Sequence, residues 1–447
     1  MSGSIGRFAT RVTPAFGYAG FRRLWAATMT SMMGFWMLSV TQGWLVGELT
    51  ESPFMLGVLA FFRSVPMLVL SPFGGILADK VRRTRLLIVA QVLMGTADLT
   101  IGILVLLELV AWWHLAVSGM MVGASFAVSS PARNALVSDL VPRKVVSNGV
   151  ALMSTTMNAS RVLGPTVAGF MIGLVGITGT YFTQVGTYVL AVVNIRRVRV
   201  EEPPPGYAGS AWAALREGFG HVWRRPTLLA LMLLGTSPAM FSMPMVMLLP
   251  ALVKQDLGAG PAELGILLGL LGVGAVVGSL SVVAFSGFKY KGAAVMLAAL
   301  LDGVMVMVLG FSQSLVGAGV ALAFMGIFQA VYLAMIQTIL QLMVPNRLRG
   351  RVLSIWMLGW GLTPVGLLPM SALAEAASTP FAMVLSGGIG VAVAVAVMVL
   401  ARQLWTLDPE AEMEGMEESE GGAGLGEEAG DLAAAAGALE LPELPDA

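Results

Sequence analysis

The sequence predicts an all-α membrane protein with twelve transmembrane helices in two pseudo-symmetric six-helix bundles. Of its 447 residues, 57% are hydrophobic and only 12% are charged, whereas soluble domains carry about 25% charged residues. Apolar runs of about 20 residues, the length that spans a bilayer, recur along the chain. Loops rich in Lys and Arg alternate with loops that hold acids, as expected when successive loops lie on opposite sides of a membrane.

The first bundle is expected over residues 24–199 and the second over residues 228–402. The apolar runs of the first lie near 24–49, 54–78, 86–108, 112–134, 149–176 and 178–195. Those of the second lie near 228–252, 262–286, 292–311, 315–341, 352–377 and 380–402. All of the 26 Lys and Arg residues except Arg63, Arg161 and Lys254 fall on one side of this topology. The positive-inside rule therefore predicts a multi-pass protein of the inner (plasma) membrane with both termini cytoplasmic.

Three segments lie outside the bundles. Residues 1–23 form a basic N-terminal segment that is expected to be cytoplasmic. Residues 200–227 form a cytoplasmic linker, which begins with a Pro-rich stretch and continues into an amphipathic helix in the headgroup plane. Residues 403–447 form an acidic tail with 13 of the 26 acids and no base from position 408 onward, a composition typical of disorder.

Several classes of function are excluded by what the sequence lacks. It contains no cysteine and only two histidines, His114 and His221, so no thiolate or histidine metal site is expected. No P-loop motif is present, which argues against nucleotide binding. The bases are scattered over many loops rather than clustered on one face, which argues against nucleic acid. We expect no enzymatic activity and no cofactor, and solute movement that is downhill or coupled to an ion gradient.

The loop between the second and third apolar runs carries the most specific motif, GGILADKVRRTR at residues 74–85. It resembles the signature of the major facilitator superfamily at this place, Gly-x-Leu-Ala-Asp-Arg-x-Gly-Arg-Arg, with Lys80 replacing an arginine and Arg82 standing where glycine is frequent. The resemblance implies the major facilitator fold and a cytoplasmic latch that stabilises the outward-facing state. The latch residues would be Gly75, Asp79, Lys80, Arg82, Arg83 and Arg133. The matching stretch of the second half, residues 286–292, lacks the acid, so the latch would be one-sided.

Further stretches resemble one branch of this superfamily, which contains enterobactin-type siderophore exporters and macrolide efflux proteins. They are residues 44–53, 131–137, 164–165 and 344–352. Gly164 and Pro165, followed by Gly169, are similar to the fifth-span signature of the exporters. That signature is a helix-packing surface which helps to set the side on which the protein opens.

Two arginines inside apolar runs are candidates for substrate binding. Arg161 lies near the middle of the fifth run, where an arginine is tolerated only if it faces protein or water. A structural ion pair between helices explains it equally well. Arg63 lies about eight residues into the second run. Its side chain can reach the outer headgroups or line the cavity, and we favour the cavity.

Asp98 and Asp302 are the buried acids, in the third and ninth runs, and are candidates for proton coupling because a carboxyl in a low-dielectric environment can carry protons. The resemblance places these two spans at the periphery, which favours a neutral structural aspartate hydrogen-bonded to a neighbouring helix. Further polar candidates lie in cavity-lining runs. They are Gln42 of the first run and Gln329, Tyr332 and Gln337 of the tenth.

These observations predict a secondary active transporter that works by alternating access. The favoured activity is proton-coupled export of an amphipathic organic solute such as a drug or siderophore. The expected partners are this small-molecule solute, protons and membrane lipids. One alternative is an importer or flippase for a lipid-like or nutrient substrate. A second is a non-transporting membrane receptor or scaffold that uses the acidic tail.

Overall fold

The computed structural model describes residues 13–200, 220, 223, 226–284, 289–344, 352 and 363–407, and regular structure in these residues is entirely helical. The N-terminal residues 1–12, most of the expected linker with its amphipathic helix, and the tail from residue 408 lie outside this part of the chain. The expected eleventh run is described only at residue 352 and from residue 363.

The first group of helices covers residues 14–196. It consists of η1 (Pro14–Gly17), α2 (Ala19–Thr50), α3 (Pro53–Lys80), α4 (Arg83–Leu106), α5 (Trp112–Leu140), η2 (Arg143–Val145) and α6 (Val146–Arg196). α2 begins five residues before its apolar run. The side chains of Arg22 and Arg23 account for this extension, because they donate to the carbonyl oxygens of Phe16 and Arg197 and hold the start of the helix in place.

α6 contains two of the expected spans, because the chain reverses within it. Gly176 has φ 71° and ψ 178°, a backbone conformation that only glycine adopts easily. Before this residue α6 runs parallel to α2, since Ser160 contacts Met29 and Gly164 faces Trp36. After Gly176, α6 runs antiparallel to α2. Gln184 donates to Thr41, whereas the later Arg197 carbonyl accepts from the earlier Arg23.

The second group of helices covers residues 226–406. It consists of α8 (Pro226–Phe241), α9 (Met243–Met247), α10 (Leu249–Ala251), η3 (Leu252–Asp256), α11 (Pro261–Ala284), α12 (Lys291–Phe311), α13 (Leu315–Met343), α15 (Thr363–Ala376), α16 (Thr379–Leu400) and η4 (Arg402–Thr406). The expected seventh span is divided into several pieces, and the breaks before α9 and α10 coincide with Pro244 and Pro250. The Ser386 hydroxyl donates to the Phe241 carbonyl at the first break, at 2.7 Å, and so satisfies an exposed backbone acceptor. The chain also stays ordered beyond residue 402, because Leu404 and Leu407 are buried against the second group.

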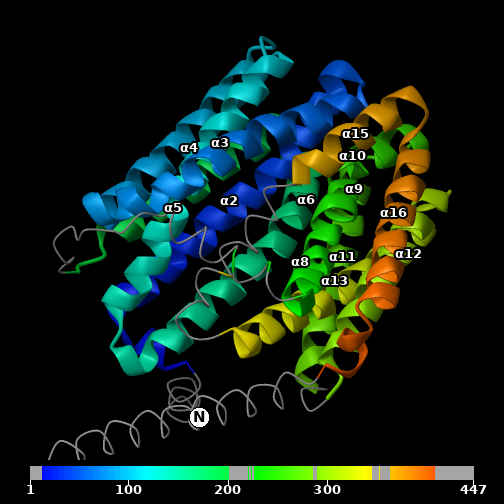
Figure 1. Cartoon of the computed structure of the whole chain (residues 1–447). Coiled ribbons are helices and arrows are strands. Elements are labelled where there is room, and N and C mark those ends of the chain that lie inside the picture. The colour runs from blue at the N-terminus through cyan, green and yellow to red at the C-terminus, as the bar shows by residue number, and fades with distance from the viewer. Residues whose placement is uncertain are drawn as a thin grey trace, which may run out of the picture.

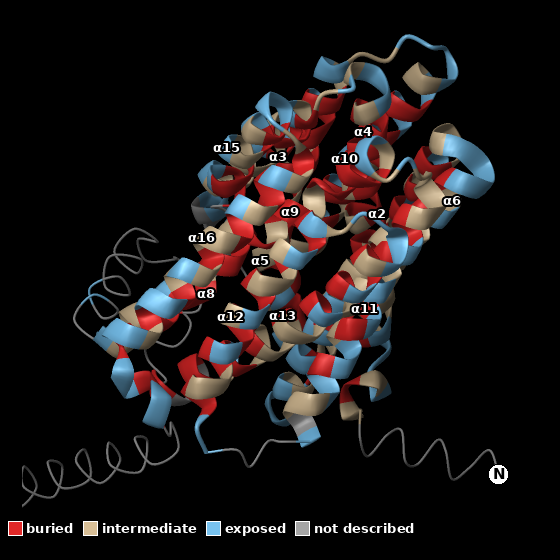
Figure 2. Ribbon diagram, turned by 90° about the vertical axis from the view of Figure 1, so that its right-hand side faces the viewer, coloured by how far each residue is buried: buried red, intermediate tan, exposed pale blue. Residues whose placement is uncertain are grey.

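Nine helical stretches in the described residues are long and apolar enough to cross a membrane. α2 is not among them, and only 14 residues of α15 are described. Exposed residues lie along the outer faces of the helices (Figure 2). Large apolar residues are among them, with Leu174 79%, Val316 77% and Leu400 86% exposed. Such surfaces suit lipid rather than water. The chain is therefore a multi-pass helical membrane protein.

The two groups lie side by side (Figure 1). They pack their own helices in the same pattern. In the first group α3 packs with α5, and α4 packs with α5 and α6. In the second group α11 packs with α13, and α12 packs with α13 and α16. Contacts between the groups are made mainly by α6 with α11 and by α3 with α15.

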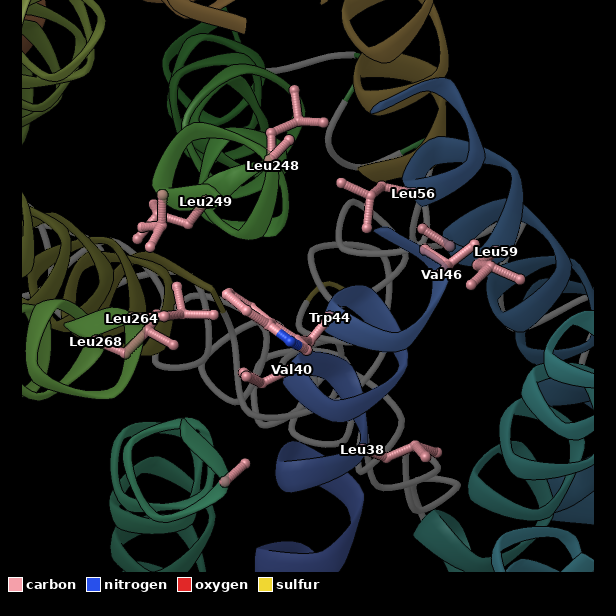
Figure 3. Packing of buried hydrophobic residues seen from close by; sticks show 14 of the residues in the cluster. Leu38, Val40, Trp44, Val46, Leu56, Leu59, Leu248, Leu249, Leu264 and Leu268 are labelled. Carbon is pink, nitrogen blue, oxygen red and sulfur yellow. The ribbon is translucent and has the colours of Figure 1, made fainter. Parts of the chain in front are cut away.

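The buried apolar residues form three cores. One core, the shared core, takes residues from both groups, among them Trp44, Leu56, Leu249 and Leu264. Figure 3 shows Trp44 reaching from α2 toward Leu249 and Leu264 of the other group. The other two cores each belong to one group, around Leu24, Leu136 and Ile195 and around Leu228, Val295 and Ile339.

The distribution of these cores distinguishes the two ends of the molecule. We call the end where α2 stops at Thr50 and η3 stops at Asp256 the closed end, because the two groups share one core there. We call the opposite end, where α2 and α8 begin, the split end, because each group has a separate core there. By the charge pattern of the loops, the split end is the one predicted to be cytoplasmic.

The backbones of the two groups approach each other closely where α6 crosses α11. A Cβ atom added at Gly169 would overlap the backbone of Gly265 and lie 2.9 Å from the Pro261 carbonyl oxygen. Neither neighbour is a side chain that could move aside. Because apolar lipid gives helices little hydrophobic reason to associate, such close backbone contact is a main source of their attraction.

We therefore expect Gly169→Ala to destabilise the contact between the groups by about 1–3 kcal/mol, the usual cost of overpacking. Gly173→Ala, one turn further along α6, is the matched control, because its Cβ would lie at an ordinary 3.5 Å from the Ala262 Cβ. Thermal unfolding of both variants in detergent checks this. Equal melting temperatures for the two variants would contradict the assignment of this contact.

Candidate functional site

Arg161 lies between the two groups, midway along the molecule. One turn later on α6, a Cβ at Gly164 would lie 2.6 Å from the Trp36 Cβ, so α6 is pressed against α2. This contact places the Arg161 guanidinium 5.9 Å from the centre of the Trp36 ring. On the side of the second group, its Nη2 lies 2.8 Å from the Met243 sulfur. Tyr332 and Asp302 are close enough to interact with it electrostatically.

Asp302 is the acid that the second group places near this arginine. Its side chain is 1% exposed and is hydrogen-bonded by Ser242 and Gln329. Gln329 in turn donates to the Ser242 hydroxyl at 2.9 Å. Oδ1 of Asp302 has no partner in the described residues, and the aspartate lines a small cavity with room for about one water molecule. The predicted residues Arg161, Asp302, Gln329 and Tyr332 are thus brought together.

Three arginines of the first group each lie against an aromatic ring, and one of these rings, Phe35, contacts the other two. Phe126 stacks on Phe35 with ring centres 4.7 Å apart, and Phe35 meets Trp36 edge to face at 5.4 Å. Arg63 lies 5.7 Å from the Phe35 ring, and Arg133 lies 5.7 Å from the Phe126 ring. We call this cluster the arginine–aromatic array. Its members are Phe35, Trp36, Arg63, Phe126, Arg133 and Arg161.

The positive charge of the array is only partly compensated. Arg133 is 2% exposed, and its Nε and Nη2 have no hydrogen-bond partner in the described residues. Neither Arg63 nor Arg133 forms an ion pair within that part of the chain, where the one such pair is Arg83 with Asp139. A cation–ring contact contributes about 0.5–2 kcal/mol. Removing a guanidinium from water costs several kcal/mol, so the rings alone do not offset the burial of these charges.

Asp98 occupies the corresponding position in the first group, but it lies among aromatic hydroxyls rather than beside an arginine. It is fully buried and interacts electrostatically with Tyr181 and Tyr188, which pack on the flanking Gly102 and Gly95. Both of its carboxyl oxygens lack a partner in the described residues, as do both tyrosine hydroxyls. The two predicted aspartates thus differ in surroundings.

The other predicted polar candidates lie apart from these clusters. Gln42 donates weakly to the Leu115 carbonyl at 3.4 Å and to the Ser118 hydroxyl at 3.3 Å, and so ties α2 to α5. Gln337 is exposed on α13. Pro165 lies inside α6, between Gly164, which packs on α2, and Gly169, which packs on α11.

The expected latch lies at the split end and is described only in part. The surroundings of Gly75 and the side chain of Asp79 lie outside the described part of the structure. Lys80 and Arg82 are exposed there, and Arg83 forms its ion pair with Asp139 at the far end of α5.

At the closed end, polar side chains of the second group bind the loop between α2 and α3, a set of contacts that the sequence did not predict. Lys254 donates to the Gly47 carbonyl at 3.0 Å, and Gln255 donates to the Glu51 carbonyl at 2.8 Å. One carboxylate oxygen of Glu375 accepts from the Ser52 hydroxyl at 2.7 Å and from the Phe54 backbone N–H at 3.3 Å. We call Lys254, Gln255 and Glu375 the clamp.

The clamp charges match the helix ends that they contact. Gly47 lies in the last turn of α2, where carbonyl groups are unpaired and the helix dipole is negative, so the Lys254 cation is favourable there. Phe54 lies in the first turn of α3, where unpaired N–H groups make the end positive, which suits the Glu375 carboxylate. Ser52, the N-cap residue of α3, makes no cap bond of its own. The second group thus caps two helices of the first.

Comparisons with known proteins show the family of the chain. A family model described as transmembrane secretion effector matches residues 11–421. The chain is 25% identical to the multidrug efflux pump Tap of Mycolicibacterium fortuitum, over 78% of this chain and 88% of Tap. It is 25% identical to the staphyloferrin A transporter of Staphylococcus aureus, over 77% of this chain and 86% of that protein. It is 24% identical to the enterobactin exporter EntS of Shigella boydii, over 76% and 81% of the two chains.

Solved structures show the same fold. A bacterial homologue of the human lysosomal transporter Spinster, in an inward-facing and unoccupied conformation, superposes with a TM-score of 0.65 at 15% identity. The match covers 87% of this chain and 96% of that one. A POT family transporter in complex with 5-aminolevulinic acid superposes with a TM-score of 0.70 at 10% identity, over 87% and 97% of the two chains.

Because the Glu375 carboxylate joins the two groups at the closed end, we expect Glu375→Gln to increase the population of states in which the groups are separated at this end. The native chain has no cysteine, so Leu109→Cys and Leu315→Cys can carry a spin-label pair there. We expect the population with the longer distance between the labels to increase about threefold to tenfold. This corresponds to weakening the contact between the groups by about 1 kcal/mol.

Glu263→Gln is the matched control for this measurement. Glu263 is an acid at the same end, but it accepts from the Gly260 N–H of its own group at 3.0 Å. If both variants shift the distances equally, or neither does, Glu375 does not hold the groups together.

Proposed function

Because this chain belongs to the transmembrane secretion effector family of the major facilitator superfamily, we propose that it exports an amphipathic organic solute by alternating access. The observation that carries this proposal is the division of the apolar core. The groups share one core at the closed end and have separate cores at the split end. A protein joined at one end and divided at the other can expose a central site to one side of the membrane at a time.

The two groups of helices are, in this proposal, the two six-helix halves of a twelve-span transporter. The nine apolar stretches, together with α2, α15 and the reversal of α6 at Gly176, support that number. The matching packing patterns of the groups support the pseudo-symmetry. With the basic loops in the cytoplasm, the structure corresponds to the state that is open toward the cytoplasm and closed by the clamp.

The direction of transport is inferred from the relatives. Tap is a multidrug efflux pump and EntS is an enterobactin exporter, and the alignments with both cover more than three quarters of this chain. The site between the halves combines aromatic rings and Met243 with a few polar groups, a composition that suits an amphipathic organic solute. Together these favour export over import of a nutrient.

The energy source in this proposal is the proton gradient. No nucleotide-binding motif is present in the sequence. Asp302 is the stronger candidate for the proton carrier, because it lines a cavity, its Oδ1 has no partner among the described residues, and Arg161 of the other half lies nearby. An ionised Asp302 attracts Arg161 whereas a protonated one does not, so proton binding would alter the attraction between the halves.

The second gate of this proposal is the cytoplasmic latch. Asp79, Lys80, Arg82, Arg83 and Arg133 would come together when the split end closes. The ion pair between Arg83 and Asp139 supports part of it, since this pair already fixes the start of α4 against the end of α5.

Proton coupling can be tested with the purified protein in liposomes that contain a pH-sensitive dye, while a macrolide or a lipophilic cation is offered. We expect solute-dependent proton movement that Asp302→Asn abolishes, because an amide cannot exchange a proton at this site. Asp98→Asn decides between the two aspartates. If solute-dependent proton movement is lost in this variant alone, coupling takes place in the first half. Unchanged proton movement in both variants would contradict coupling through a buried aspartate.

A further inference from the structure

We infer that the exported solute is an organic anion that carries a flat apolar group, and that the arginine–aromatic array binds it. The inference rests on the proposed transport function and adds to it the charge and shape of the substrate.

The sign of the charge follows from the groups that face the array. Three guanidinium groups come from three different helices, α3, α5 and α6, and converge on one set of touching rings. The acid that interacts with the array across the interface is Asp302, which lies close to Arg161 and already accepts hydrogen bonds from Ser242 and Gln329. One carboxylate cannot balance three guanidinium groups. An anionic group would complete the electrostatics of the site, whereas a cation would add to the repulsion.

The unused hydrogen-bond donors point to the same conclusion. Structural arginines inside proteins usually have their donors satisfied by carboxylates or backbone carbonyls. Arg133 is only 2% exposed, yet its Nε and Nη2 have no hydrogen-bond partner in the described residues. Guanidinium groups present paired donors that match the two oxygens of a carboxylate, phosphate or sulfonate.

The flat apolar group follows from the geometry of the rings. Phe126 and Phe35 stack with 24° between their planes, and Trp36 stands at 86° to Phe35. The array thus combines two stacked rings with a third ring at a right angle to one of them, next to the Met243 side chain of the second half. Planar aromatic groups pack well in such a corner, and thioether sulfur contacts aromatic rings favourably.

The position of the array links binding to the movement of the halves. Arg161 of the first half touches Met243 of the second, so an anion held by Arg161 lies at the interface between the halves. Substrate sites of transporters with internal repeats lie at this place, near the middle of the membrane.

The inference can be tested with three naphthalene probes of nearly equal shape: 2-naphthoate, 2-naphthamide and 2-naphthylmethylammonium. Binding to the purified full-length protein in lipid nanodiscs is measured by calorimetry. We expect the anion to bind about tenfold or more tightly than the amide, and the cation to bind more weakly than the amide. Equal binding of all three probes, or tightest binding of the cation, would overturn the inference.

Variants locate the site on the array. Arg63→Gln and Arg161→Gln should each weaken 2-naphthoate binding about tenfold and leave 2-naphthamide binding within about twofold. Arg161→Lys keeps the charge and should retain more of the affinity, which separates a charge effect from misfolding. Arg143→Gln, an exposed arginine at the split end, is the matched control and should change nothing. Undiminished anion binding in both array variants would overturn the inference even if the selectivity for the anion is found.

A transport assay with the same probes in proteoliposomes separates this inference from the proposed function. Transport of the cation in preference to the anion would support export and overturn the anion site. Anion-selective binding that depends on Arg161, without transport of any probe, would support the anion site and count against export.

Discussion

The close backbone contact between α6 and α11 is the constraint on which the rest of the structure depends. Lipid tails are as apolar as the helix surfaces, so the halves are held together by close packing and by hydrogen bonds rather than by the hydrophobic effect. Gly169 lets α6 lie directly on the backbone at Gly265, and Gly164 lets the same helix lie on α2. Arg161 stands one turn before Gly164, so these contacts fix its guanidinium at the interface between the halves.

Three arginines can be buried near this contact because each lies on an aromatic ring. The cation–ring contacts offset only part of the free energy lost when the guanidinium groups leave water. A site that keeps uncompensated charge in an apolar environment is less stable than a neutral one. In a transporter this cost has a use, because a ligand of opposite charge recovers part of it on binding.

The sequence predicted the helices well, because apolar runs and basic loops report directly on the membrane. It also marked Arg161 and Asp302, since charges inside apolar runs stand out. It could not predict the array, because Phe35, Trp36 and Phe126 occur at helical spacings that ordinary core packing also produces. The motif predicts a latch role for Arg133, which stays a prediction, and it gives no sign of the contact between this guanidinium and Phe126. The clamp was missed because its acceptors on Gly47 and Glu51 are backbone carbonyls, which every sequence contains.

The chemistry of the clamp sets the free energy that is needed to separate the halves at the closed end. Its hydrogen bonds are mostly exposed to solvent and cap helix ends, so each contributes about 0.5–1.5 kcal/mol, and four of them contribute a few kcal/mol together. A buried ion pair at the same place would be much harder to break. A ligand must supply about 5.5 kcal/mol of differential binding to reverse a 1:99 equilibrium. A contact with Arg161 that changes affinity about tenfold supplies about 1.4 kcal/mol, so an anion must contact several members of the array in one state and not in the other to reach this scale.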